Sequence, residues 1–236
     1  MLKINQLKYS YKNQKFDFSI NINKGNILGI VGPSGSGKST FLALLAGLIE
    51  PNSGEIIYNN QNITKKNIEE RPFKIIFQNN NLFNHLTVQQ NIGIGIKTNL
   101  KFAKKEIDKI QQQAELFGIK TLVDKYPPQL SGGEIQRTAL ARIMLQSQPI
   151  LLLDEPFTGL DPTLRQELYD KLLKLKEINK MTLLLVTHYP EDCLKIADKV
   201  ALISDGIIKE DKSTVDFFSK PYSKSIKEYL GKLEIN

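Results

Sequence analysis

Apolar and polar residues alternate near the start of the chain. From Phe16 to Ile22 every second residue is apolar, a period typical of a strand with one buried face. Leu2, Ile4 and Leu7 precede this stretch with a similar composition. We therefore expect residues 2–31 to form a series of short strands.

Other apolar runs have no alternation. Such continuous runs are typical of strands that are covered on both faces of a largely parallel sheet. They occur at Ile27–Val31, Ile150–Leu153, Leu183–Val186 and Val200–Ser204. Two shorter strands are predicted at Glu55–Tyr58 and near Lys74–Phe77, and Asp205-Gly206 predicts a hairpin turn.

Helical periodicity appears elsewhere. Within Ala103–Phe117 the apolar residues are spaced three and four apart, and Gly118 follows as a stop signal. Asp161-Pro162 predicts the start of another helix, and a third is expected around Thr40–Gly47. The fold class is therefore α/β: a mixed, largely parallel sheet with an N-terminal antiparallel β part, interrupted by a mostly helical insert at about 83–149.

Composition and charge exclude several classes of protein. The 236 residues carry a formal net charge of +7, and the excess lies at 1–25, 62–75 and 97–125. Only four of the 32 cations are Arg, and none of the like-charge runs exceeds two residues, so the charge does not predict nucleic-acid readout. A single cysteine, Cys193, fits a reducing compartment, and the chain contains neither a spanning apolar stretch nor a signal-peptide core.

A glycine-rich loop carries the strongest chemical signal. It reads Gly32-Pro33-Ser34-Gly35-Ser36-Gly37-Lys38-Ser39-Thr40 and fits the phosphate-loop pattern G-x-x-x-x-G-K-[ST]. It lies between a predicted strand and a predicted helix, so its backbone N–H groups and the helix N-terminus can surround phosphate oxygens. We expect Lys38 to reach the β- and γ-phosphates of a nucleotide and Ser39 to give its hydroxyl to Mg²⁺.

Two further motifs bear on phosphate chemistry. Asp154 and Glu155 end the apolar run that begins at Ile150, and a strand end beside a phosphate loop is where α/β sheets place ligand groups. Asp154 suits a role linked to Mg²⁺, and Glu155 suits activation of a water. Ser131-Gly132-Gly133-Glu134 precedes a predicted helix, and by itself this motif is equally consistent with a phosphate contact or a simple helix cap.

The order of these motifs identifies a resemblance. The motifs follow one another as the phosphate loop, Gln78, Leu130-Ser131-Gly132-Gly133, Leu152-Leu153-Asp154-Glu155-Pro156, Gly159-Leu160-Asp161 and Thr187-His188. In this order they resemble the ATP-binding subunit of an ABC transporter, and the resemblance covers nearly the whole chain. The resemblance implies an ABC-ATPase core of the P-loop NTPase class as one domain over 1–236, with no C-terminal regulatory domain. It also implies ATP and Mg²⁺ as cofactors, and a homodimer in which each ATP lies between one chain's phosphate loop and the other's Ser131 loop.

The resemblance also implies roles for individual residues. Tyr11 would stack on adenine, and Asp161 would lie at the dimer contact. Gln78 would bind Mg²⁺ and water and link them to the transport subunits, while His188 would hold the γ-phosphate and the attacking water. Glu134 stands where the family more often has Gln, which changes the contact that it could make with a ribose.

Within the family, the chain resembles the ATP-binding subunits of bacterial thiamine importers. The similarity lies in residues 78–93, 148–157 and 161–167. It implies permease subunits, a periplasmic substrate-binding protein, and a peripheral position on the cytoplasmic face of the inner membrane, without nucleic acid. The alternatives are an importer ATPase for ferric iron or a polyamine, a nucleic-acid-linked ABC ATPase, and a P-loop kinase.

Overall fold

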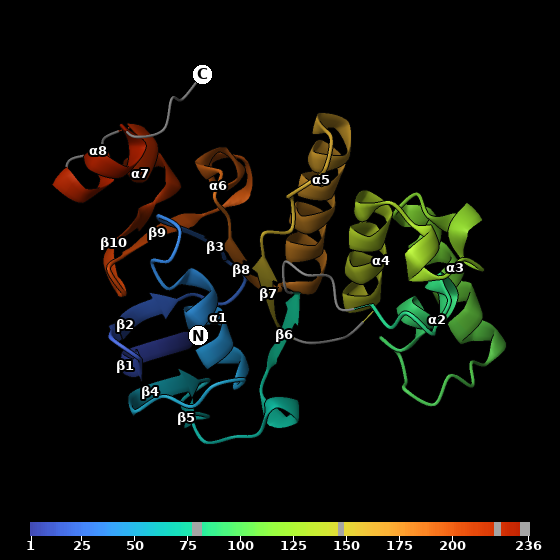
Figure 1. Ribbon diagram of the computed structural model, residues 1–236, viewed down its shortest axis with the longest axis horizontal. Coiled ribbons are helices and arrows are strands. Elements are labelled where there is room, and N and C mark those ends of the chain that lie inside the picture. Colours follow the sequence, from blue (N-terminus) through green and yellow to red (C-terminus); the bar gives the residue numbers. More distant parts are fainter. Residues whose placement is uncertain (77–81, 146–148, 220–222, 232–236) are drawn as a thin grey trace. The chain divides into compact units, whose positions relative to one another are not determined.

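The computed structural model describes residues 1–76, 82–145, 149–219 and 223–231 (Figure 1). The chain divides into two compact units. The sheet unit consists of Met1–Ile75, Pro149–Glu155 and Thr163–Asn236, and the helical unit consists of Ile76–Gln148 and Pro156–Pro162. The predicted ligand Gln78 lies outside the described residues.

The described residues contain ten strands that form one sheet in the order β5-β4-β1-β2-β10-β9-β3-β8-β7-β6. The strands are β1 (Leu2–Tyr11), β2 (Gln14–Ile22), β3 (Ile27–Val31), β4 (Ser53–Tyr58), β5 (Gln61–Asn62), β6 (Phe73–Ile76), β7 (Ile150–Asp154), β8 (Thr182–Val186), β9 (Lys199–Ser204) and β10 (Ile207–Ser213). Every strand expected from the apolar runs is present, which confirms the predicted α/β class.

The central strands of the sheet are parallel and buried. β3 pairs with β8 and β9, and β8 pairs with β7, all in parallel. Ile30 lies opposite Val186, which lies opposite Asp154, so the carboxyl ends of β3, β8 and β7 lie in one row. All residues of these three strands are buried, as their unbroken apolar runs predict.

The N-terminal strands are longer than predicted. β1 and β2 have ten and nine residues and pair antiparallel, with a register shift between Ile4 and Leu7. Two residues, Asn5 and Gln6, lie opposite Ser19 there, and Gln6 has a φ of 44°. This β-bulge turns both Ile4 and Leu7 toward the core although they are three residues apart, so the strand continues where a strict period of two predicts its end.

The helices of the sheet unit cover the sheet. They are α1 (Lys38–Ala46), α5 (Pro162–Asn179, of which Pro162 belongs to the helical unit), α6 (Pro190–Ile196), α7 (Thr214–Ser219) and α8 (Lys224–Leu230), with a 3-10 turn at Ile68–Glu70. α1 begins two residues earlier than predicted and buries Phe41 and Leu45 in one core with β1, β2 and β3. Phe217 of α7 and Ile226 of α8 form a second core with Val31.

The helical unit contains α2 (Val88–Gly93), α3 (Lys104–Leu116) and α4 (Gly132–Met144) (Figure 1). Two 3-10 turns, Lys120–Leu122 and Pro127–Gln129, separate α3 from α4. The predicted helix at 103–117 is confirmed, and Gly118 follows it with a positive φ of 64°. α2 had no clear periodic signal, because it has only six residues.

No helix in the described ranges is both long and apolar enough to span a lipid bilayer.

The predicted hairpin is confirmed, since Ile207 of β10 pairs with Ser204 of β9 across Asp205-Gly206. Both turn residues have positive φ, 53° and 77°, which is what a tight two-residue hairpin with the right-handed twist requires.

Arg71 fixes the far end of the helix that follows the phosphate loop. Its guanidinium is buried and donates to the carbonyls of Leu44 and Leu45 at 2.9 and 2.8 Å. It also donates to the carbonyls of Thr64 and Lys66 at 2.6 and 2.9 Å. Arg71 therefore caps the last turn of α1, where the Leu44 carbonyl also accepts the N–H of Gly47 at 3.2 Å.

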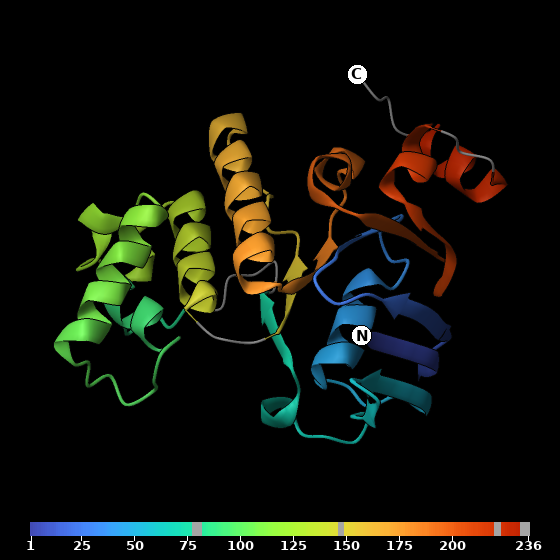
Figure 2. The ribbon, with the colours of Figure 1, turned by 180° about the vertical axis from the view of Figure 1, so that it is seen from behind.

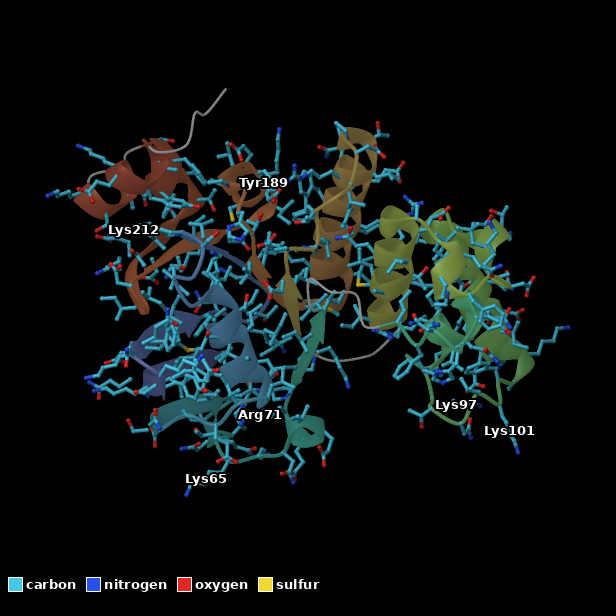
Figure 3. The ribbon with its side chains drawn as sticks, viewed as in Figure 1. Lys65, Arg71, Lys97, Lys101, Tyr189 and Lys212 are labelled. Carbon is cyan, nitrogen blue, oxygen red and sulfur yellow. The ribbon has the colours of Figure 1, made fainter. Side chains whose placement is uncertain are left out.

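We expect Arg71→Ala to lower the free energy of unfolding by about 2–4 kcal/mol, because several buried carbonyls lose their donor at once. Urea denaturation followed by circular dichroism measures the change. Lys65→Ala is the matched control, since Lys65 is exposed in the same connection and its loss should change stability by less than about 0.5 kcal/mol. Figure 3 labels both residues. Equal stability of the two variants would contradict the capping role of Arg71.

Candidate functional site

The phosphate loop joins β3 to α1 in a conformation that requires glycine. Gly32 has a φ of 150°, and a Cβ built on it would lie 1.9 Å from the carbonyl oxygen of Ile203. Gly37, at the start of α1, has a φ of 107°. The Ser36 hydroxyl is buried and lacks a hydrogen-bond partner among the described residues. The loop can therefore offer this hydroxyl to a ligand.

Lys38 is buried inside the loop. Its Nζ donates to the carbonyls of Gly32 at 2.8 Å and Pro33 at 2.9 Å. Burial lowers the pKa of the ammonium, and the negative charges of Glu155 and Asp154 oppose that shift. The loop thus curls around the amine, and nucleotide phosphates are the stronger acceptors that could replace the two carbonyls.

Asp154 is the last residue of β7 and is only 6% exposed. Burial raises the pKa of its carboxyl group, although the Ser39 hydroxyl donates a hydrogen bond to it and Lys38 lies near. A carboxylate and a hydroxyl side by side are oxygen ligands of the kind that Mg²⁺ prefers. The donor set therefore fits the predicted metal site, since a cation would compensate the desolvated carboxylate.

Glu155 and His188 contact each other. Nε2 of His188 lies 2.5 Å from Oε1 of Glu155. Glu155 has a φ of 52°, unusual for a residue with a side chain, and its own N–H donates to the carbonyl of Val186 at 2.9 Å. A strained backbone held in this way is typical of functional positions.

The sheet explains why these residues meet. These four residues lie at or after the carboxyl ends of β3, β7 and β8, which pair side by side (Figures 1 and 2): Asp154 is the last residue of β7, and Lys38, Glu155 and His188 come after the ends of β3, β7 and β8. Ligand groups gather at this edge of a parallel sheet because every strand there ends in a loop at the same level. The structure thus brings four of the predicted site residues together in the sheet unit.

A groove of about 360 Å³ lies on the other side of the phosphate loop. It is lined by Asn13–Phe16, Pro33–Ser36 and Ser204–Gly206. Tyr11 ends β1, is 55% exposed, and has the Lys12 ammonium 5.4 Å from its ring centre. Tyr11 does not line the groove, so its stacking on adenine stays a prediction.

The Ser131 motif caps α4 in the helical unit. Glu134 Oε2 accepts the N–H of Ser131 at 2.7 Å, and the Ser131 hydroxyl accepts the N–H of Glu134 at 3.4 Å. The hydrogen bond from Ser131 lowers the pKa of Glu134. The helix-cap interpretation is therefore confirmed, and it explains why Glu serves as well as Gln here, since both side chains can close a capping box.

The capping box leaves two donors available. The N–H groups of Gly132 and Gly133 lie in the first turn of α4, where no carbonyl of the helix can accept them. A Cβ built on Gly132 would meet nothing within 4 Å. The motif therefore keeps the donors and the space that a phosphate contact needs.

Sequence reasoning missed residues that lie next to the site. Asp192, in α6, is 0% exposed and accepts hydrogen bonds from the hydroxyls of Tyr169 and Thr187. Arg165, in α5, pairs with the same carboxylate at 2.8 Å. An acidic residue four positions after His188 was the only available signal, and it looked like an ordinary surface charge of a short helix.

The geometry defines a class of protein. A glycine-rich loop around a buried lysine, with two carboxylates and a histidine at the neighbouring strand ends, is a P-loop nucleotide-binding site. The chain belongs to the ABC transporter family, whose model matches residues 16–158. It is an ATPase of that family, as the order of its motifs predicts.

Named proteins similar to the chain extend over nearly its full length. The thiamine import ATP-binding protein ThiQ of Aliivibrio fischeri is 41% identical over 230 residues, 98% of either chain. The protein of that name from Yersinia pseudotuberculosis is 44% identical over 214 residues, 91% of either chain.

Solved structures confirm the fold. A dimeric ATP-binding cassette in a post-hydrolysis state, bound to ADP and Pi, has a TM-score of 0.81 at 26% identity, covering 91% of this chain and 99% of that one. A nucleotide-free cassette of an ABC transporter also reaches 0.81, over 98% of this chain and 95% of its own. The predicted ABC-ATPase fold is therefore confirmed.

We expect Gly32→Ala to abolish binding of a fluorescent ATP analogue, because the new methyl group collides with the backbone of Ile203. Gly35→Ala is the matched control: Gly35 also has a positive φ, 74°, but a Cβ there meets nothing within 4 Å. The control should retain binding and lose only about 1–2 kcal/mol of stability, the cost of a side chain at a left-handed backbone. Fluorescence titration and thermal unfolding measure both effects, and binding by Gly32→Ala at the control's level would contradict the loop geometry.

Proposed function

We propose that the chain is the ATP-hydrolysing subunit of a thiamine importer. The observation that carries the hydrolytic part is the cluster of Lys38, Asp154, Glu155 and His188 at one edge of the sheet. The transported substrate is proposed from the similarity over almost the whole chain to proteins named for thiamine import. No residue described above has a chemical reason to contact thiamine, which fits a subunit that supplies energy.

Phosphate binding is the role of the loop and of Lys38. The nucleotide phosphates would replace the carbonyls of Gly32 and Pro33 as acceptors for Nζ. The loop N–H groups and the N-terminus of α1 add further donors, so negative charge that develops during phosphoryl transfer is stabilised where it appears. Tyr11 would stack on the base, beside the groove that begins at Asn13.

Mg²⁺ would be held by the Ser39 hydroxyl, the Asp154 carboxylate and Gln78. When bound, the ion supplies charge neutralisation for the phosphate oxygens. The raised pKa of Asp154 supports this assignment, since its carboxylate is desolvated and only partly compensated by Ser39 and Lys38. Thr40 follows Ser39 in the first turn of α1 and belongs to the same phosphate-binding segment.

Glu155 is the proposed general base, and His188 is its partner. The carboxylate orients a water for in-line attack on the γ-phosphorus and accepts a proton from that water, while the bond from the γ-phosphorus to the bridging oxygen breaks and ADP leaves. The His188 imidazole, whose Nε2 lies 2.5 Å from Glu155, would hold the γ-phosphate and the water in place once ATP is bound. The left-handed backbone conformation of Glu155 holds its carboxylate at the end of β7.

The functional assembly is proposed to be a homodimer. The Ser131 loop presents the N–H groups of Gly132 and Gly133, and Asp161 is exposed ahead of α5, both in the helical unit. These groups would complete the nucleotide site of a second chain. The two solved cassettes at 26 and 27% identity that are described as dimeric support this assembly.

The remaining partners follow from an importer role. The chain would lie on the cytoplasmic face of the inner membrane through permease subunits, and a periplasmic substrate-binding protein would deliver the substrate to them. The low share of Arg among the cations gives no support to a nucleic-acid partner. A P-loop kinase would leave the Ser131 loop and His188 without a role.

Glu155→Gln should retain ATP binding and lose at least about 100-fold in the rate of hydrolysis, because the amide cannot accept a proton from water. Release of phosphate from purified protein and binding of a fluorescent ATP analogue measure the two properties separately. Asp170→Asn serves as the control, since Asp170 is exposed on α5 and should leave both unchanged. Hydrolysis by Glu155→Gln near the wild-type rate would contradict the assignment of the base.

Purification of the tagged chain from its own membranes tests the transport role. We expect it to retain a permease, and vesicles that contain the complex and a thiamine-binding protein to take up labelled thiamine only with ATP inside. The Glu155→Gln complex is the control for uptake. Uptake of ferric iron or a polyamine in place of thiamine would replace the substrate while keeping the ATPase assignment.

A further inference from the structure

A buried polar network lies directly behind His188. Its centre is the carboxylate of Asp192, which is 0% exposed. The hydroxyls of Tyr169 and Thr187 donate to it, each at 2.5 Å, and the guanidinium of Arg165 lies at 2.8 Å. These residues come from α5, α6 and the end of β8, all in the sheet unit.

The network holds the backbone on both sides of His188. The Thr187 hydroxyl accepts the N–H of Tyr189 at 3.0 Å while it donates to Asp192. The N–H of Asp192 donates to the carbonyl of Tyr189 at 3.0 Å, and the Arg165 guanidinium lies 4.8 Å from the centre of the Tyr189 ring. The turn 187–189 is thus fixed by the side chain of Thr187, by the backbone of Tyr189 and by the cation–π contact of Arg165 with the Tyr189 ring. Figure 3 labels Tyr189, which directly precedes α6.

Such a network needs a reason to exist. Removing a carboxylate from water is unfavourable unless it is fully paired and hydrogen-bonded, so a buried acid by itself is weak evidence for a role in stability. Burial and the hydrogen bond to Asp192 raise the pKa of Tyr169, which keeps its hydroxyl a donor. Buried groups that satisfy one another in this way specify one local arrangement.

We propose that Asp192, held by Arg165 and Tyr169, is a positioning residue that fixes the turn 187–189 so that Nε2 of His188 meets Glu155. This inference rests on the proposed hydrolytic role of Glu155 and His188. Asp192 is fully buried, and it acts on His188 through its contacts with Thr187 and Tyr189.

Two variants test the network at different strengths. Asp192→Asn removes the charge that Arg165 and both hydroxyls share, and Tyr169→Phe removes one hydroxyl while keeping the buried ring. Tyr169→Phe keeps the test open if Asp192→Asn does not fold. Lys176→Gln is the matched control, because Lys176 also lies on α5 and binds Asp198 at 2.6 Å, away from His188.

The chain offers a direct readout, since His85 and His188 are its two histidines. Nitrogen–proton correlation spectra of the imidazoles, assigned with a His85→Gln variant, report the setting of each ring in nucleotide-free protein. We expect the His188 signal to shift or broaden in both network variants and to stay unchanged in Lys176→Gln. The His85 signal, from the helical unit, should be the same in all of them.

Kinetics supplies the second readout. Loss of a positioning contact should lower kcat by roughly 10-fold in Tyr169→Phe and roughly 100-fold in Asp192→Asn. These losses do not exceed what a positioned acid–base group contributes to a rate. The affinity for ATP should change by less than about 2-fold. Variants that lose stability but keep the control's His188 signal and kcat would make the network purely structural and overturn the proposal. A fall in kcat without a change at His188 would also overturn it.

The proposed ATPase function and the positioning role of Asp192 can be contradicted separately. If the wild-type chain did not hydrolyse ATP, the proposed function would be wrong, and the His188 spectrum would still decide whether the network positions the ring. If the wild type hydrolyses ATP and Glu155→Gln does not, while the network variants behave like Lys176→Gln, only the positioning role is wrong.

Discussion

Parallel pairing of β3 with β8 and of β8 with β7 is the constraint on which the site depends. It sets the carboxyl ends of three strands in one row, so the loops that leave them begin at the same level. Lys38, the adjacent pair Asp154-Glu155, and His188 come from three distant parts of the chain and meet only because of this register. A slip of one residue along β7 would exchange the facing of every side chain on that strand.

The same arrangement concentrates unfavourable features at one edge. Lys38 and Asp154 are both buried, with the pKa of each shifted against its charged form, and Glu155 has a left-handed backbone. Such strain persists only where the surrounding structure over-determines it. The buried strands, Arg71 at the end of α1 and the network around Asp192 supply that rigidity, and each does so through contacts with backbone atoms or fully buried partners.

Local signals predicted most of the elements and the chemistry of the loop. The sequence predicted three of these features because each depends on residues that are adjacent in the chain: the continuous run Ile150–Leu153, the hairpin at Asp205-Gly206 and the phosphate loop. The length of β1 could not be predicted from the sequence, since the bulge at Asn5 and Gln6 depends on pairing with Ser19 of the next strand. Asp192 and Arg71 looked like ordinary charges, because burial and partners are properties of the folded chain.

The sequence by itself therefore determined the α/β class, the phosphate-binding loop and the order of motifs that marks an ABC ATPase. The tertiary structure alone decided that His188 reaches Glu155, that Glu134 closes a capping box with Ser131, and that a buried carboxylate supports the turn 187–189. The physical reason is the range of the interactions. Hydrogen-bonded turns and apolar periodicity act between near neighbours, whereas the site's geometry and burial arise from contacts between segments that are distant in the chain.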